Sequence, residues 1–337
     1  MKAVLLIGGE ATRLRPLTCN TPKAMVPVLN RPFLENVFRH LSSHGVKEFI
    51  LTQRNAGASI EDYFGDGSKF GVKLTYIVET TPLGTAGAVK NAEKYVDDAF
   101  LVLNGDVYNE LDVTAMIAYH RKNKAKATIA LTPLENPTAY GLVFTEKNGR
   151  VTRFLEKPTP EQATTNMINA GTYILEPEVL SRMPPQTKYS FERQLFPSLL
   201  ETGWPVYGYP SKGYWIDIGT PEKYLQVHRD LLGKSAEGNV LVGDGSKVHP
   251  KARIKGPTAI GENVIIGEGA VIEQSVIWGR VKVEGGVKIR NSVIANDCCI
   301  GAESVIEDSV IGDNVTVVKG AVLKPGSKIW PGTKVEA

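Results

Sequence analysis

The segment after the first apolar run carries the residues best suited to phosphate chemistry. It begins with adjacent glycines, Gly8 and Gly9, and Arg13, Arg15 and Lys23 follow Glu10 with no acidic residue among them. Paired glycines let backbone N–H groups approach an anion closely, and cations neutralise a triphosphate as charge moves onto leaving pyrophosphate. The segment matches neither the dinucleotide-binding pattern G-x-G-x-x-G nor the P-loop pattern G-x-x-x-x-G-K-[ST]. It therefore predicts a phosphate-binding loop of another kind.

Two acidic residues are candidate magnesium ligands. Asp106 follows the strand-like run 100–103, and Asp217 lies in the apolar stretch 213–218. Ligands of open α/β sheets gather at the carboxyl ends of strands, and Mg²⁺ prefers one or two carboxylates together with phosphate oxygens. Taken alone, Asp106 is better explained as a cap on the next turn. A backbone turn could also satisfy Asp217, whose burial without a partner would be costly.

Residues 8–18 read GGEATRLRPLT, and Pro22-Lys23 follows them. This stretch resembles the signature G-G-x-G-T-R-L-x-P-x-T, followed by P-K, of the sugar nucleotidyltransferase family. The residues that this resemblance implicates in nucleotide binding are Gly8, Gly9, Thr12, Arg13 and Lys23. The last two would bind the triphosphate and stabilise the transition state.

Ala11 is the one departure from the signature that matters, because the pattern usually has glycine there. A positive φ would strain an alanine by about 1 kcal/mol or more. We therefore expect Ala11 to have a negative φ within a working loop.

Other segments extend the resemblance along the chain. The family places its two metal-binding aspartates at the positions of Asp106 and Asp217. Residues 79–87 resemble the loop that meets the nucleobase. Segments around Tyr140-Gly141, Glu156-Lys157-Pro158 and Asn169-Ala170-Gly171 resemble the sugar pocket. The resemblance thus implies nucleotide contacts for Glu79, Gly84 and Thr85, and sugar-phosphate contacts for Gly141, Glu156, Lys157 and Asn169. Of these, Lys157 would hold the sugar phosphate.

Glu79 leads the nucleobase segment, and its chemistry favours guanine. Guanine offers two adjacent donors, N1–H and the N2 amino group, and one carboxylate can accept both. Uracil and thymine flank their single N3–H with carbonyl oxygens, which a carboxylate repels, and adenine sets an acceptor beside its amino group. The alternative is that Glu79 merely ends the preceding strand in solvent.

These residues need a scaffold, and residues 1–235 alternate strand-like and helix-like segments. Strands are expected at 3–7, 49–52, 74–78 and 100–103, with helices beginning at Pro32 and at about Thr85. Residues 142–144 and 151–154 flank Asn148-Gly149, which predicts a hairpin. Such alternation predicts an α/β, Rossmann-like domain with a mixed, mostly parallel sheet.

Residues 236–337 have a different texture. Val, Ile and Gly dominate, and an aliphatic residue recurs every six positions, with short steps at three segments spaced 17 residues apart. The recurring positions are Val248, Ile254, Ile260, Ile266, Ile272, Ile277, Val283, Ile289, Ile294, Ile300, Ile306, Ile311, Val317, Leu323, Ile329 and Val335. The period predicts a triangular coil of short strands whose aliphatic residues point inward. It resembles the hexapeptide repeat, which implies a left-handed parallel β-helix.

Composition narrows the classes of function. The 337 residues carry a net charge of only +3, which argues against a nucleic-acid partner. No apolar run is long enough to cross a membrane. Three cysteines make neither a disulfide framework nor a zinc pattern, and the five histidines form no cluster. We expect a cytoplasmic protein with small-molecule substrates, assembled as a homo-oligomer through the β-helix.

Within the family, the chain most resembles the mannose-1-phosphate guanylyltransferases. That resemblance implies transfer of a nucleotidyl group from GTP to mannose 1-phosphate with Mg²⁺, forming GDP-mannose and pyrophosphate. The alternatives are a glucose-1-phosphate uridylyl- or thymidylyltransferase, a bifunctional acyltransferase and a non-catalytic regulatory subunit. A regulatory subunit would be expected to lose loop cations or metal acids, yet this chain keeps Arg13, Lys23, Asp106 and Asp217. An acyltransferase usually needs a histidine base, and the repeats contain only His249.

Overall fold

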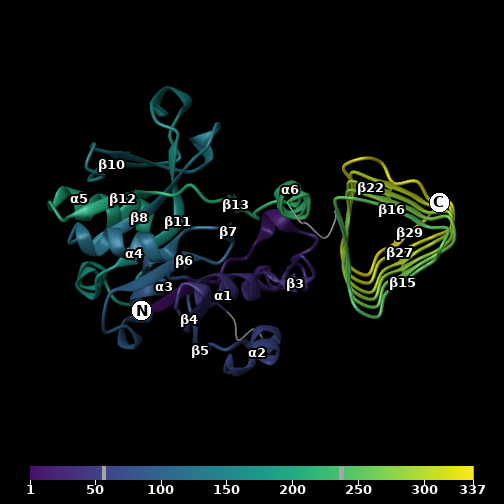
Figure 1. Ribbon diagram of the computed structural model, residues 1–337, viewed down its shortest axis with the longest axis horizontal. Helices are drawn as coiled ribbons and strands as arrows, with labels where there is room; N and C mark the ends of the chain where they lie inside the picture. Colours follow the sequence, from purple (N-terminus) through teal and green to yellow (C-terminus); the bar gives the residue numbers. More distant parts are fainter. Residues whose placement is uncertain (55–57, 235–238, 337) are drawn as a thin grey trace. The chain divides into compact units, whose positions relative to one another are not determined.

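The computed structural model describes residues 1–54, 58–234 and 239–336, which form two compact units (Figure 1). The first unit comprises Met1–Gly9 and Val37–Ile216, and the second comprises Glu10–Asn36 and Asp217–Ala337. The predicted domain boundary between residues 235 and 236 lies outside the described residues.

A nine-stranded mixed sheet forms the centre of the first unit, in the order β10-β9-β11-β6-β1-β4-β5, with β8 pairing both β11 and β12. This confirms the predicted fold class. The strands are β1 (Lys2–Leu6), β4 (Glu48–Gln53), β5 (Lys73–Val78), β6 (Phe100–Asn104), β8 (Ala127–Pro133), β9 (Gly141–Thr145), β10 (Val151–Glu156), β11 (Met167–Leu175) and β12 (Val206–Pro210). A separate pair joins β7 (Val107–Asn109) to β13 (Trp215–Asp217).

The parallel part of the sheet has a topological switch point at β1. From β1 the chain runs to β4 and β5 on one side, and only then to β6 on the other side, all in parallel. β1 and β6 are apolar runs whose central residues are fully or almost fully buried, as expected for strands covered on both faces. Ligands of open α/β sheets bind at such a point, beyond the carboxyl ends of the strands.

The helices are α1 (Phe33–Ser43), α2 (Ala58–Phe64), α3 (Gly84–Asn91), α4 (Val113–Lys122), α5 (Phe196–Glu201) and α6 (Pro221–Gly233). Gly45, two residues after the end of α1, has a φ of 82°, the left-handed conformation in which glycine commonly ends a helix. The second predicted helix, α3, begins one residue before the expected Thr85. It ends at Asn91, and a 3₁₀ turn over Glu93–Tyr95 leads into the extended Val96 before β6. The predicted hairpin is confirmed by antiparallel β9 and β10.

Three parallel sheets form the β-helix of the second unit, which Figure 1 shows as a triangular coil. The first sheet contains β14 (Val240–Val242), β17 (Thr258–Ile260), β20 (Val276–Ile277), β23 (Val293–Ile294), β26 (Val310–Ile311) and β28 (Lys328–Ile329). The second contains β15 (Lys247–Val248), β18 (Ile265–Ile266), β21 (Lys282–Val283), β24 (Cys299–Ile300), β27 (Thr316–Val317) and β29 (Lys334–Val335). The third contains β16 (Arg253–Lys255), β19 (Val271–Glu273), β22 (Lys288–Arg290) and β25 (Val305–Glu307).

The repeated aliphatic residues fill the interior of this coil, as predicted. From Ile260 to Leu323 each member of the series is buried in one hydrophobic cluster, and Ile254, Ile329 and Val335 pack against its ends. Val248, in the first coil, is 37% exposed. Three parallel sheets around an aliphatic core are the architecture of the left-handed β-helix that the repeat implies. Among the described residues, no helix is both long enough and apolar enough to span a membrane.

Candidate active site

The first unit places Gly8 and Asp106 beyond the paired ends of β1 and β6. Leu6 and Asn104 are register partners, and the Gly105 N–H donates to the Leu6 carbonyl oxygen at 2.9 Å. A Cβ built on Gly105 would lie 2.5 Å from that oxygen, so only glycine fits between the strands. The close approach sets Asp106 at the switch point, which agrees with the expectation that it lies where ligands gather.

Asn104, two residues before Asp106, was not predicted as a site residue. Its Oδ1 atom is buried and has no hydrogen-bond partner in the described structure, and a Cβ on Gly171 would lie 2.7 Å from its Nδ2 atom. A buried acceptor without a partner marks a place where a bound group would supply one. Together with the Asp106 carboxylate it offers oxygen donors of the kind that Mg²⁺ prefers, so the residues present fit that metal. The sequence signal for Asn104 is an apolar strand-like run that leads into two polar residues, Asn104 and Asp106.

Asp217 lies in the second unit, within a cluster of charged groups. It is 7% exposed, and Lys223 forms an ion pair with its Oδ1 atom. A Cβ on Gly219 would lie 2.9 Å both from Asp217 Oδ2 and from Arg13 Nη2, so Arg13 and Asp217 approach the same glycine. Lys223 offsets the cost of burying the carboxylate, and the sequence interpretation missed it. Its position in the first turn of α6 was the available signal, because a cation is unfavourable at a helix N-terminus unless it has a partner.

No group of three or more His, Cys, Asp or Glu side chains in the described parts of the chain is arranged to hold a metal ion alone. Mg²⁺ keeps waters and phosphate oxygens among its ligands and needs few carboxylates.

The expected conformation of Ala11 was wrong. Its φ of 47° and ψ of 37° are left-handed, and a 3₁₀ turn over Thr12–Leu14 follows directly. Two hydrogen bonds hold the Ala11 carbonyl, from the Leu14 N–H at 3.1 Å and from the Thr18 hydroxyl at 2.8 Å. Leu14 and Leu17 are fully buried, so the packed turn imposes a conformation that alanine alone would avoid. Arg13 and Arg15 extend from this turn and are exposed.

Lys23 begins a second 3₁₀ turn, Lys23–Met25, directly after Pro22. The Met25 N–H donates to the Pro22 carbonyl at 2.8 Å, and the Val26 N–H donates to that of Lys23 at 3.2 Å. The fixed φ of a proline suits it to the start of a helical turn. The backbone around Lys23 is therefore ordered by short-range contacts on both sides.

Glu79 is buried, so the alternative that it ends the strand in solvent is excluded. It is 7% exposed, and the Leu83 N–H donates to its Oε2 atom at 3.3 Å. Burial raises the pKa of Glu79, against the lowering effects of the Leu83 hydrogen bond and of Arg54. One carboxylate oxygen thus helps to close the 79–83 turn, a role that the sequence interpretation did not consider.

Gly84 and Thr85 are fixed by the segment 187–192. Gly84 has a φ of 69°, and a Cβ there would lie 2.8 Å from the Tyr189 carbonyl oxygen, so it needs to be glycine. The Thr85 hydroxyl donates to Glu192 Oε2 at 3.1 Å and accepts the Phe191 N–H at 3.0 Å. Glu192 also accepts the Ser190 hydroxyl at 2.6 Å at the start of a π-helix, Phe191–Leu195. These contacts order the start of α3.

The predicted sugar segments come together at the ends of β9, β10 and β11. Gly141 and Glu156 are register partners, and a Cβ on Gly141 would lie 2.9 Å from Glu156 Oε2. Asn169 is tied locally, because its Nδ2 donates to the Tyr173 hydroxyl at 2.9 Å and its Oδ1 accepts the Gly171 N–H at 3.0 Å. Burial raises the pKa of Glu156, and the negative charge of Glu192 adds to that shift, against the lowering effect of nearby cations.

Lys157 and an aromatic pair complete this group in the first unit. Lys157 is exposed, has a φ of 49°, and donates its N–H to the Tyr140 carbonyl at 3.2 Å. Tyr140 lies edge-on to Trp215 with ring centroids 5.5 Å apart, and the Trp215 indole donates to the Ala170 carbonyl at 2.9 Å. Sequence interpretation used the segments around both rings but did not predict that they meet.

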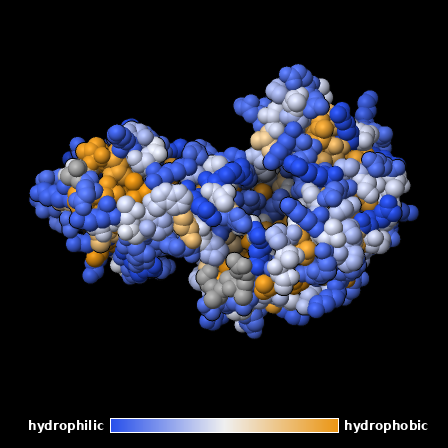
Figure 2. Space-filling view, turned by 180° about the vertical axis from the view of Figure 1, so that it is seen from behind, coloured by the Kyte–Doolittle hydropathy of each residue, from blue (hydrophilic) through white to orange (hydrophobic). Residues whose placement is uncertain are grey.

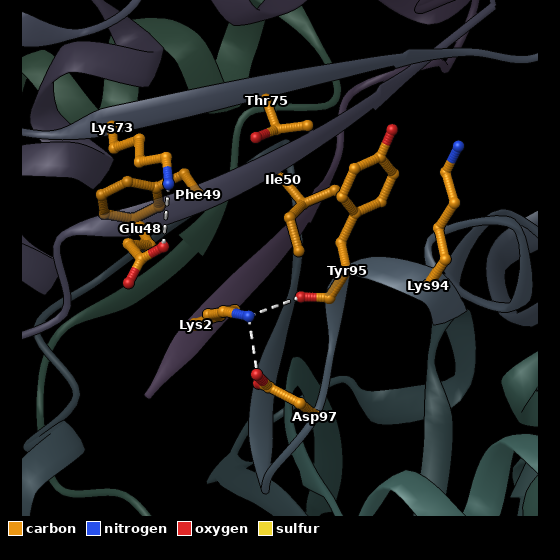
Figure 3. A pocket seen from close by; sticks show the side chains of 9 residues that line it. All are labelled: Lys2, Glu48, Phe49, Ile50, Lys73, Thr75, Lys94, Tyr95 and Asp97. Carbon is orange, nitrogen blue, oxygen red and sulfur yellow. Dashed lines mark hydrogen bonds and ion pairs between the residues drawn. The ribbon is translucent and has the colours of Figure 1, made fainter.

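A pocket of about 210 Å³ lies at the opposite edge of the sheet, at the amino ends of β1, β4 and β5 (Figure 3). Lys2 pairs there with Asp97 at 3.0 Å, and Lys73 pairs with Glu48 at 3.6 Å. Its lining, within the described part of the chain, includes none of the predicted site residues. We therefore do not assign this pocket to phosphate chemistry.

Comparison with known proteins agrees with this arrangement. A family model described as "Nucleotidyl transferase" matches residues 2–234, and one described as "GMPPB C-terminal domain" matches residues 236–337. A mannose-1-phosphate guanylyltransferase of Mycobacterium tuberculosis is 39% identical over 274 residues, covering 78% of this chain and 76% of that protein. A UTP–glucose-1-phosphate uridylyltransferase of Synechocystis is 33% identical over 309 residues, covering 79% and 80% respectively.

A solved structure adds a nucleotide complex. The crystal structure of HddC from Yersinia pseudotuberculosis complexed with GMP-PN matches with a TM-score of 0.58 and 32% sequence identity. The match covers 67% of this chain and 97% of that chain.

Proposed function

The chain belongs to the nucleotidyl transferase family, and on that premise we propose that it transfers GMP from GTP to mannose 1-phosphate. The products are GDP-mannose and pyrophosphate. The buried carboxylate of Glu79, at the head of the nucleobase segment, is the observation that carries the choice of GTP. The guanylyltransferase relatives and the HddC complex with GMP-PN support it.

The reaction needs no nucleophile from the protein. An oxygen of the sugar phosphate attacks the α-phosphorus of GTP, the bond from that phosphorus to the bridging oxygen breaks, and pyrophosphate leaves with that oxygen. Positioning and charge stabilisation are sufficient for such a step. Arg13 and Lys23 would stabilise the negative charge that grows on the departing pyrophosphate. Gly8, Gly9 and Thr12 would hold the nucleotide through the loop.

Asp106 and Asp217 would hold Mg²⁺, which would supply positive charge to offset that of the phosphates. The unpartnered Asn104 oxygen beside Asp106 supports a polar ligand there. Lys223 would keep the Asp217 carboxylate oriented until the metal binds, since the two side chains are already paired.

The sugar phosphate would be held by Gly141, Glu156, Lys157 and Asn169. Lys157 is exposed at a strand end, where an ammonium group is free of the cost of burial. Glu156 is partly buried and offers carboxylate oxygens to sugar hydroxyls. Burial raises the pKa of this carboxyl group, and hydrogen bonds donated by sugar hydroxyls would favour its ionised form.

In the nucleobase segment, Glu79 would recognise guanine, with Gly84 and Thr85 holding the turn. Glu79 Oε2 accepts the Leu83 N–H at the long distance of 3.3 Å, and each carboxylate oxygen has two lone pairs. The carboxylate therefore keeps the capacity to accept guanine N1–H and the N2 amino group.

Two further proposals concern the protein as a whole. The three cysteines are free thiols, which suits a cytoplasmic enzyme.

Hydrophobic residues gather in a patch on the face of the β-helix seen in Figure 2, and exposed apolar side chains of this unit include Trp330, 52% exposed, and Val322, 70% exposed. Such residues favour assembly of a homo-oligomer through the β-helix. Sedimentation of Trp330→Glu tests this, with a smaller assembly expected and an unchanged mass contradicting it.

The experiment that tests the activity is pyrophosphate release over a grid of nucleotides and sugar 1-phosphates, with and without Mg²⁺. The highest kcat/KM is expected for GTP with mannose 1-phosphate, and chelation of the metal should stop turnover. Preference for UTP or dTTP would overturn the guanine assignment alone. Preference for glucose 1-phosphate would overturn the sugar, and no pyrophosphate release with any pair would overturn the reaction.

A further inference from the structure

The segment that carries Lys23 continues into a strained hairpin. β2 (Pro27–Val28) and β3 (Arg31–Pro32) pair in antiparallel fashion around Leu29 and Asn30, whose φ values are 53° and 60°. A two-residue turn with both φ values positive strongly favours glycine or asparagine. Leucine in the left-handed region is costly, so contacts from elsewhere must hold this turn.

Those contacts come from α6 and from the β-helix, within the same unit. The Asn30 side-chain amide donates to the Ile260 carbonyl of β17 at 2.6 Å, and the Leu29 N–H donates to His228 Nε2 of α6 at 3.3 Å. Further back in the segment, Asn20 lies close enough to the buried Asp313 carboxylate of the β-helix to lower its pKa in part, against the raising effect of burial. The chain around Lys23 is thus anchored on both sides.

A buried hydroxyl links the segment directly to the β-helix. The Trp278 indole donates to the Tyr224 hydroxyl at 2.9 Å, and that hydroxyl donates to the Pro27 carbonyl. Both rings are buried, with Tyr224 0% and Trp278 1% exposed. A hydroxyl has one proton, so accepting the indole N–H leaves that proton directed at Pro27. Trp278 therefore orients the bond that holds the hairpin.

His228 fixes the other side of the turn in one protonation state. Its Nδ1 lies 2.9 Å from the Tyr224 carbonyl and donates to it, because Nε2 must accept the Leu29 N–H. Burial lowers the pKa of His228 to about 4, so the ring is neutral at ordinary pH. A neutral ring is what the contact with Leu29 requires.

α6 is itself seated on the outer face of the first sheet of the β-helix. Ile277 and Ile294 point inward, so the preceding residues Val276 and Val293 point outward, yet these are only 3% and 0% exposed. α6 packs against this sheet at β17, and Arg229 donates to the Asn291 side chain. The β-helix thus supports α6, and both support the hairpin after Lys23.

We infer that Tyr224, His228 and Trp278 are positioning residues for Lys23. Through them, the β-helix sets the conformation of the segment that binds the triphosphate. This inference rests on the proposed function through the role of Lys23. Only three residues separate Lys23 from Pro27, and the Val26 backbone bonds both to Lys23 and to Phe33. A shift of the hairpin therefore moves the 3₁₀ turn that presents the lysine.

A double-mutant cycle in the full-length protein tests this inference. The variants are Tyr224→Phe, Lys23→Gln and both together, and the measurements are the Kd for GTP without sugar phosphate and the kcat. Tyr224→Phe alone should weaken GTP binding or lower kcat by about tenfold while the KM for the sugar phosphate stays within about twofold. In the Lys23→Gln background it should change the same Kd by less than about twofold, because its effect acts through Lys23.

The matched control is Tyr119→Phe, which removes a hydroxyl whose bond to the Asn148 carbonyl is a long 3.5 Å, and which should leave all constants unchanged. If Tyr224→Phe does not fold, Trp278→Phe keeps an aromatic ring and removes the orienting donor together with part of the ring volume. Equal effects with and without Lys23 would overturn the inference, because a general loss of stability is additive. A wild-type protein that binds GTP but releases no pyrophosphate would overturn the proposed function, while the Kd cycle would still decide the inference.

Discussion

The two units hold their candidate active-site residues by different means. We call the first unit the sheet unit and the second the β-helix unit. In the sheet unit, Gly8, Glu79 and Asp106 follow strands and Glu156 ends one, so the register of neighbouring strands fixes their positions. In the β-helix unit, Arg13 lies in a turn held by nearby residues, whereas Lys23 lies in a turn that leads into a hairpin anchored by distant side chains, such as Tyr224 and His228. Strand-end residues need only a correct sheet, whereas turn residues need a supporting network.

The largest effect is expected at the strand end of the sheet unit. Asp106→Asn keeps the shape of the side chain but removes the charge at the proposed metal, so kcat should fall by at least about a hundredfold with the fold intact. Pyrophosphate release at several Mg²⁺ concentrations measures it, with circular dichroism as the check on folding.

Asp97→Asn is the matched control, since Asp97 is an exposed partner of Lys2 at the other edge of the sheet. It should leave kcat unchanged. Near-normal turnover of a folded Asp106→Asn protein would remove Asp106 from the site and weaken the comparison between the units.

The second prediction concerns the support network of the β-helix unit in acid. His228 has a pKa lowered by burial to about 4, whereas an unfolded histidine titrates near 6.5. The unfolded chain thus binds more protons between these values, so stability falls as the pH decreases through this window. Because one proton is taken up across this window, the free energy of unfolding falls by roughly 3 kcal/mol. Urea unfolding measured at several pH values from 7 to 4 should show this loss of stability in the wild type. The loss should be absent from His228→Gln.

His120 in the sheet unit provides the comparison. It is also buried with a lowered pKa, but Glu176 lies 3.2 Å from its Nε2 and raises the pKa in part. His120→Gln should therefore remove less of the acid dependence than His228→Gln. The same or a larger effect at His120 would contradict the role assigned to His228.

The sequence predicted the scaffold of the site well. Apolar runs that lead to Asp106 and Glu79 identified the strands β6 and β5, and the six-residue period specified the interior of the β-helix. It could not predict the bonds of Trp278 to Tyr224 or of Asn30 to Ile260. These partners are 54 and 230 residues apart, and no local pattern couples them. These pairings depend on which outer face of the β-helix packs against α6.

Ala11 shows the same limit at a single residue. Its intrinsic preference predicted a negative φ, and the buried Leu14 and Leu17 overrode that preference. Glu79 shows the same limit for solvent exposure, because nothing in its local sequence distinguishes a buried strand end from an exposed one.

The third prediction sharpens the role of Glu79. Guanine recognition needs the ionised carboxylate, and a good bidentate pair gives about 1–3 kcal/mol of discrimination, or roughly tenfold to a hundredfold. GTP should therefore exceed UTP and dTTP by at least about tenfold in kcat/KM, and Glu79→Gln should reduce that margin. Because burial raises the pKa of Glu79, the margin should decline with falling pH earlier than for an exposed glutamate.

The ratio of kcat/KM for GTP to that for UTP, measured across pH, checks this. In Glu79→Gln the ratio should not depend on pH, because the amide does not titrate. An unchanged wild-type ratio over the same range, or a wild-type preference for UTP, would leave Glu79 with only its turn-closing contact to Leu83.

The smallest effect is expected at the strained turn of the β-helix unit. Glycine at position 11 removes the roughly 1–2 kcal/mol that alanine loses in the left-handed region, but it adds about 0.4–1 kcal/mol of entropy to the unfolded chain. Ala11→Gly should thus raise the free energy of unfolding by about 1 kcal/mol or less, and Ala11→Val should lower it, because a branched side chain tolerates this φ worse. Gly9→Ala is the matched control for stability, since a Cβ on Gly9 meets no atom within 4 Å. Urea unfolding of the four proteins decides between two sources of order in the turn. If Ala11→Gly is clearly less stable than the wild type, the Ala11 methyl group contributes more by packing than it loses by strain.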